Sequence, residues 1–152
     1  MHVVLVEPEI PANTGNIART CAASGTTLHL VRPLGFSTED KYLKRAGLDY
    51  WNLVEIHYYD SFEEFAASHQ GRVFYLSTTK APRLYTEVAF QNDSFLIFGK
   101  ETKGLTPEIL SKYPDYQIRV PMIGDARSLN LANSVAVVLY EALRQQGFPG
   151  LK

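Results

Sequence analysis

Short apolar runs alternate with segments of helical spacing along the whole chain. The runs consist of adjacent apolar residues, which is typical of strands covered on both faces of a sheet. Alternating strands and helices predict a single α/β domain, residues 1–152, in which a mainly parallel sheet carries helices on both faces. The predicted strands are His2–Val6, Thr27–Val31, Leu53–Tyr58, Arg72–Leu76, Phe95–Phe98 and Gln117–Val120.

The limits of the helices are indicated by residues that cap helix ends. Thr14 is expected to cap the first helix and Gly25 to end it. Ser37 and Ser61 each begin a sequence typical of a capping box, and Pro107 suits the first position of a short helix. The last helix has one apolar face and stops before Gly147 and Pro149; this face carries Val135, Val138, Leu139, Ala142 and Leu143.

Length and composition predict a soluble, cytoplasmic protein. The 152 residues suffice for one core, and 45% hydrophobic with 20% charged residues is ordinary for a globular protein. The apolar runs are too short to span a bilayer, and no signal peptide is recognisable at the start. Cys21 is the only cysteine, which excludes an internal disulfide and a cysteine-based metal site.

Polar and glycine-containing segments follow the predicted strands, at 7–16, 77–80, 99–104 and 121–125. Ligands of open α/β sheets bind beyond the carboxyl ends of the strands, so we expect the site there. No G-x-G-x-x-G motif follows a strand, and Leu105 stands where a phosphate-binding loop would need lysine. The four histidines lack metal-ligand spacing and are interpreted as structural. The pattern indicates a small polar ligand held by main-chain groups, without a metal.

Three motifs, in order, resemble those of the SPOUT superfamily of RNA methyltransferases. Two further stretches, Glu7–Pro11 and Gly47–Tyr50, and the ending Asn133–Ala142 resemble its minimal single-domain group, so the resemblance covers essentially the whole chain. Lys100 and Ala132 depart from it, standing where proline and serine are frequent. The motifs are Asn13-x-Gly15-Asn16-Ile17-x-Arg19, Phe98-Gly99-x-Glu101-x-x-Gly104, and Val120-Pro121-Met122 with Ser128-Leu129-Asn130-Leu131.

The resemblance implies S-adenosylmethionine-dependent 2′-O-methylation of the wobble nucleotide of tRNA, cytidine or uridine at position 34. It also implies a deep trefoil knot in the C-terminal part, cofactor contacts at Ser77, Gly99, Val120 and Ser128, and Arg19 as the catalytic residue. A guanidinium group stays protonated. Arg19 is therefore expected to fix a phosphate and stabilise the developing alkoxide, rather than to act as a free base.

The resemblance further implies a homodimer, in which part of the last helix packs on its twin and Arg19 approaches the partner's cofactor. No obligatory protein partner and no membrane contact are expected. The formal net charge is −1, so RNA binding must rest on a local basic patch. Lys100, Lys103 and Arg127 are the candidate RNA contacts, together with Lys44, Arg45 and Lys80.

Two other functions remain compatible with these residues. One is 2′-O-methylation of another tRNA or ribosomal RNA site, and the other is a non-catalytic RNA-binding module. Taken singly, the motif residues also have simpler interpretations. Gly99 and Gly104 suit plain turns, Arg19 suits an exposed helix position, and Glu101 could cap its own loop.

Overall fold

The computed structural model describes residues 1–152, apart from the side chains of residues 47–49. Most of the Gly47–Tyr50 stretch that contributed to the resemblance therefore lies outside the described residues. The strands are β1 (His2–Val6), β2 (Thr27–Val31), β3 (Ile56–Tyr59), β4 (Phe74–Ser77), β5 (Arg83–Leu84), β6 (Phe95–Phe98) and β7 (Gln117–Arg119). The helices are α1 (Pro11–Ser24), α2 (Lys41–Trp51), α3 (Phe62–Ser68), α4 (Pro107–Ser111) and α5 (Leu131–Gln145), with 3-10 turns at Tyr85–Glu87 and Pro114–Tyr116.

The seven strands form one sheet in the order β3-β2-β1-β6-β4-β7-β5. Every described pairing between these strands is parallel, so the predicted parallel sheet is confirmed. The strand expected at Leu53–Tyr58 begins only at Ile56, and the two-residue β5 had no recognisable pattern in the sequence. β1 is an interior strand of the sheet, between β2 and β6.

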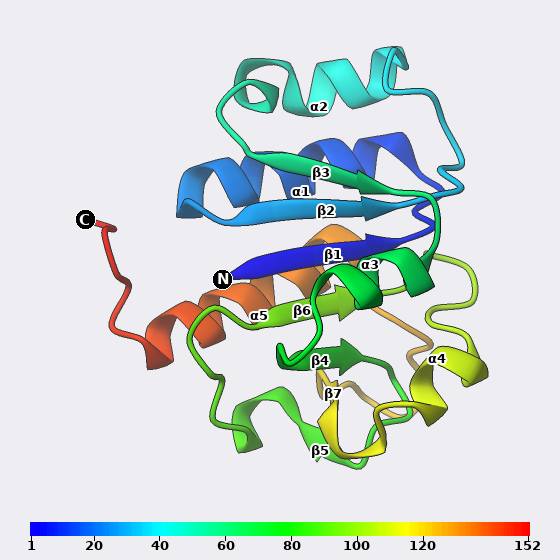
Figure 1. The fold of residues 1–152 in the computed structure, drawn as a ribbon, viewed down its shortest axis with the longest axis vertical. Coiled ribbons are helices and arrows are strands. Elements are labelled where there is room, and N and C mark those ends of the chain that lie inside the picture. The colour runs from blue at the N-terminus through cyan, green and yellow to red at the C-terminus, as the bar shows by residue number, and fades with distance from the viewer.

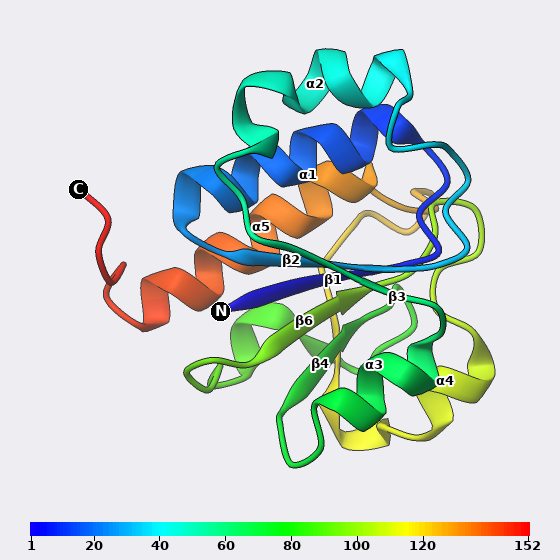
Figure 2. The ribbon, with the colours of Figure 1, turned by 45° about the horizontal axis from the view of Figure 1, so that its top comes forward.

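Helices cover both faces of the sheet, as predicted (Figures 1 and 2). Successive side chains of a strand point to opposite faces. Val3 and Leu5 of β1 pack in a core with α1 and α5, whereas Val4 and Val6 pack in a second core with α3 and α4. α2 lies over α1, on the side away from the sheet (Figure 2).

α1 begins earlier than the sequence predicted. Pro11 takes its first turn, so Thr14 is a buried residue inside the helix and not its cap. The Thr14 hydroxyl has no hydrogen-bond partner within the described part of the chain. The prediction that Thr14 caps α1 was wrong. The helix begins at Pro11, and the hydrogen bonds at its start are accepted by a carboxylate from a distant loop, described below. Gly25 ends the helix in a left-handed conformation (φ 63°), as expected.

The other helix ends follow local capping chemistry. Ser61 and Thr106 accept the expected backbone bonds at the starts of α3 and α4. Asp40, rather than Ser37, caps α2. α5 begins after Asn130, and its predicted apolar face lies buried in the protein's own core. Within the described residues, no helix combines the length and apolar character needed to span a membrane.

Candidate functional site: a groove at the carboxyl ends of the strands

A groove of about 580 Å³ opens where β4 and β6 end. These strands are neighbours in the sheet, so the segments that follow Ser77 and Phe98 emerge side by side. The wall of the groove is completed by the segment before α5 and by the start of α1. The lining residues are 77–80, 98–105 and 127–131 together with Ile10, Asn13, Pro107, Leu110 and Ser134.

Gly99 allows the loop after β6 to fold back on itself. A Cβ at this position would lie 2.1 Å from the carbonyl carbon of Gly104 and 2.2 Å from the nitrogen of Leu105. Lys100 and Gly104 form a short antiparallel bridge, closed by a backbone hydrogen bond of 2.8 Å. Gly104 itself has a positive φ of 66°. Both glycines are therefore required by the backbone geometry of this wall.

The carboxylate of Glu101 caps the start of α1. It accepts hydrogen bonds from the backbone N–H of Glu9 (2.8 Å) and of Ile10 (3.0 Å), and from Asn13 Nδ2 (3.2 Å). A negative charge at a helix N-terminus is favourable because it faces the positive end of the helix dipole. The interpretation of Glu101 as a cap of its own loop is therefore wrong, because its carboxylate joins the second motif to the first.

Asn13 extends this connection to the third motif. Its Oδ1 accepts a hydrogen bond from Asn130 Nδ2 at 3.0 Å. The Oδ1 of Asn130 in turn accepts from the backbone of Ala132 and Asn133, which caps α5. One chain of side chains, Glu101–Asn13–Asn130, thus holds together the three segments that line the groove. We refer to these three residues as the motif clamp.

A second set of contacts fixes the same loop to the segment after β1. Lys100 Nζ lies 2.7 Å from Glu7 Oε2, and this hydrogen bond raises the pKa of the lysine. Thr102 donates its hydroxyl to Glu9 Oε1 at 2.9 Å. Lys100, a candidate RNA contact, thus forms a partly exposed ion pair with Glu7 of the same chain, whereas Lys103 and Arg127 are exposed at the groove.

The structure brings together three of the four predicted cofactor residues. Ser77, Gly99 and Ser128 line the groove. Ser77 is half-buried, Gly99 is buried and Ser128 is exposed. Val120 is not among the described lining residues; its side chain is partly buried against the core shared with α1 and α5. Asn13 and Asn130 lie within the motifs, but their spacing did not reveal that their side chains meet.

Arg19 lies elsewhere, on the exposed side of α1. Its guanidinium carbon sits 4.7 Å above the ring of Tyr50 at the end of α2. Such a cation–π contact holds the guanidinium in place while leaving it accessible. Arg19 is not among the described residues that line the groove, so a single chain does not bring the predicted catalytic residue to the predicted cofactor residues.

All four histidines cluster on the sheet face covered by α3, apart from the groove residues. The ring of His29 stacks on His57 at 5.2 Å and meets His69 edge-on at 5.4 Å. Its nitrogens lie 3.0 Å from His2 Nδ1 and 3.0 Å from the Tyr59 hydroxyl. In the part of the chain that is described, no group of three His, Cys, Asp or Glu side chains is arranged to hold a metal ion.

Burial keeps two of these histidines neutral. Desolvation, reinforced by the neighbouring histidines, lowers the pKa of His29 to about 3. Desolvation and the nearby N-terminal ammonium lower the pKa of His2 to about 4. His2 and His29 therefore pack as uncharged aromatic rings at neutral pH, in agreement with the structural interpretation of these two histidines.

Known proteins are similar to this chain in sequence and fold along nearly its whole length. The chain is 50% identical to the tRNA (cytidine(34)-2′-O)-methyltransferase of Methylovorus glucosotrophus, over 97% of each chain. It superposes with a TM-score of 0.92 on a solved structure described as "Structural insights into the 2-OH methylation of C/U34 on tRNA". That protein is 45% identical, and the match covers 96% of this chain and 95% of the other.

A more distant structure, the SpoU methyltransferase AviRb from Streptomyces viridochromogenes in complex with AdoMet, matches at a TM-score of 0.84 and 26% identity. The match covers 96% of this chain and 60% of that one. The fold is thus that of the SPOUT methyltransferases, including the C-terminal trefoil knot that the motifs predicted. Residues 1–140 match the SpoU rRNA Methylase family, and the chain belongs to this family.

Proposed function

We propose that this protein transfers a methyl group from S-adenosylmethionine to the ribose 2′-hydroxyl of nucleotide 34 of tRNA, where that nucleotide is cytidine or uridine. The observation that carries the proposal is the groove in which three separate motifs meet, in a chain that is similar from end to end to proteins named for this reaction.

The lining of the groove fits this cofactor. A nucleoside with a charged amino-acid arm needs apolar contact for its base and main-chain or hydroxyl partners for its polar groups. Phe98, Leu105 and Leu110 supply apolar surface, while Ser77 and Ser128 supply hydroxyls. The volume of about 580 Å³ lies within the range of ordinary small-molecule sites. When bound, the cofactor supplies an electrophilic methyl group.

Ser77, Gly99 and Ser128 would hold the cofactor in this proposal. The main chain at Gly99 is open to close approach because the glycine carries no side chain, and the motif clamp keeps its loop in position. Val120 would contact the cofactor through its main chain, since its side chain packs against the core. The protein's contribution is then mainly to align the ribose hydroxyl with the methyl group.

Arg19 would act on the RNA and not on the cofactor. Its permanently charged guanidinium can bind the phosphate beside the target ribose and stabilise the alkoxide as the hydroxyl loses its proton. Because Arg19 lies outside the groove of its own chain, the site would be completed by a second copy, in a cytoplasmic homodimer of single-domain chains. Exposed apolar side chains support such an interface: Val137 and Tyr140 on α5, and Ile123 and Leu129 beside the groove.

The decisive experiment maps 2′-O-methylation in tRNA incubated with purified protein and S-adenosylmethionine. We expect one new methyl group, at position 34, and none in tRNA carrying a 2′-deoxy nucleotide there. Methylation elsewhere, or no methylation, would refute the proposal. Arg19→Ala should abolish single-turnover methylation at saturating substrates while cofactor affinity is retained, and Arg19→Lys should restore little because lysine lacks the two-pronged geometry.

A further inference from the structure

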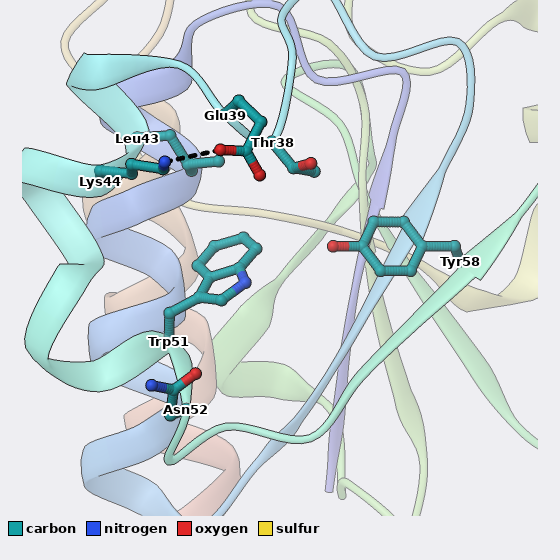
Figure 3. A pocket seen from close by; sticks show the side chains of 7 residues that line it. All are labelled: Thr38, Glu39, Leu43, Lys44, Trp51, Asn52 and Tyr58. Atoms are coloured by element: carbon teal, nitrogen blue, oxygen red, sulfur yellow. Dashed lines mark hydrogen bonds and ion pairs between the residues drawn. The ribbon is translucent and has the colours of Figure 1, made fainter.

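A second, smaller pocket lies between α2 and β3, and none of its described lining residues belongs to the groove. Its volume is about 220 Å³. In Figure 3, Trp51 and Tyr58 flank the pocket, and the Tyr58 hydroxyl points across it toward the indole ring. Leu43 contributes apolar surface at the back. The pocket therefore combines aromatic surface with an opening to solvent.

Polar and charged groups surround these rings. Lys44 Nζ and Glu39 Oε2 form an ion pair of 2.6 Å at the edge of the pocket (Figure 3). Arg32 places its guanidinium carbon 5.0 Å above the Tyr58 ring. Asn52 adds an amide that can both donate and accept hydrogen bonds. Both cations are paired with carboxylates, Lys44 with Glu39 and Arg32 with Asp60 at 3.3 Å, so they supply no free charge. The flat apolar surface with hydrogen-bonding groups around it suits a planar, polar-edged ring.

The pocket also adjoins the residue proposed to act on the RNA. Trp51 directly follows Tyr50, whose ring holds Arg19. If Arg19 contacts the phosphate of the target nucleotide, RNA passes over this end of α2. The net charge of −1 means that general electrostatic attraction contributes little to affinity, so contacts of another kind are needed. Stacking of unpaired bases on aromatic side chains provides such contacts in single-stranded RNA recognition.

We propose that the Trp51–Tyr58 pocket receives one unpaired nucleobase of the tRNA, stacked on Trp51. The target ribose then lies at the groove of the second copy, which Arg19 of this chain completes. The inference rests on the proposed function, because it assumes a tRNA substrate. The volume favours a single base over a whole cofactor: about 220 Å³ is below the usual range of small-molecule sites, whereas the groove lies within it.

Trp51 is the only tryptophan of the chain, so its fluorescence reports on this pocket alone. Titration of the wild-type protein with an unmodified anticodon stem-loop should change this fluorescence saturably. S-adenosylmethionine alone should leave it unchanged, and dilution of the free protein should also leave it unchanged. A response to the cofactor would assign the pocket to that ligand, and a response to dilution would assign it to a second copy of the chain; either result overturns the proposal.

Variants test the energetic contribution of stacking. Trp51→Ala should weaken stem-loop binding by about five- to a hundredfold, as for loss of one stacked base. Trp51→Phe should retain most of the affinity. Leu53→Ala is the matched control, because Leu53 is 71% exposed two residues farther along and outside the pocket. Unchanged S-adenosylmethionine binding by each variant shows that it is folded.

Salt dependence separates stacking from charge. Because stacking releases no counterions, Trp51→Ala should lower affinity without changing the slope of log K against log salt. Lys103→Ala at the groove should reduce that slope by close to one. Wild-type stem-loop affinity in Trp51→Ala, with methylation of position 34 intact in the parent protein, overturns only this inference. Absence of methylation in the parent protein refutes the proposed function itself.

Discussion

Replacement of Glu101 tests whether the motif clamp stabilises the protein. Glu101→Ala removes the acceptor of three hydrogen bonds, two of them from the backbone at the start of α1. Loss of a helix cap costs about 1 kcal/mol, and hydrogen bonds to a charged group contribute about 1.5–3 kcal/mol each when buried. The Glu101 side chain is only partly buried, so hydrogen bonds to water replace part of the lost stabilisation. We expect the free energy of unfolding to fall by about 2–3 kcal/mol.

Urea denaturation at a fixed protein concentration measures this loss. With a typical dependence of about 2 kcal/mol per molar urea, the midpoint should fall by about 1 M. Glu101→Gln keeps an acceptor oxygen without the charge, so its urea midpoint should fall about half as far. Glu108→Ala is the control, because Glu108 is exposed on α4 and its change should cost less than about 0.5 kcal/mol. If Glu101→Ala unfolds at the wild-type midpoint, the clamp does not stabilise the fold.

Two further substitutions have defined outcomes. Gly99→Ala should lower S-adenosylmethionine affinity by about tenfold or more in calorimetry, because the new Cβ would overlap the backbone at Gly104. Gly124→Ala is the control, because a Cβ there meets nothing within 4 Å and the variant should bind normally. Equal affinities of the two variants would contradict the role of Gly99. The unfolding free energy should fall as pH drops from 6.5 toward 4, by up to about 1.4 kcal/mol per pH unit for each buried histidine. The lowered pKa of His29 means that the unfolded chain binds protons that the folded chain does not. His29→Phe should reduce the dependence of the unfolding free energy on pH between 6.5 and 4. An unchanged dependence would show that other groups control acid stability.

The position of the groove could be predicted from the sequence, because it depends on a local property. Polar segments directly follow apolar runs, and the carboxyl ends of parallel strands share one edge of a sheet. Ser77 and Gly99 meet for this reason, since β4 and β6 are neighbours. Gly99 was identified only through the resemblance of its motif, because taken singly a glycine after a strand suits a plain turn.

The contacts that fix the groove could not be predicted, because they join residues far apart in the chain. Nothing near Glu101 indicates that its carboxylate reaches the start of α1, and the spacing of Asn13 and Asn130 does not reveal that they meet. The predicted cap at Thr14 was wrong for the same reason. The Trp51–Tyr58 pocket depends on how α2 packs beside β3, and hydrophobic periodicity carries no information on that arrangement.

The interior position of β1 has a consequence for synthesis of the protein on the ribosome. β1 is made first, yet one of its two neighbours is β6, and the cap of α1 comes from a residue 92 positions after Glu9. At about 5–20 residues per second, some 5–20 seconds pass between the two. During that time one edge of an apolar strand has no partner, and such edges favour aggregation. The newly made N-terminal half therefore stays unfinished until about two-thirds of the chain has been translated.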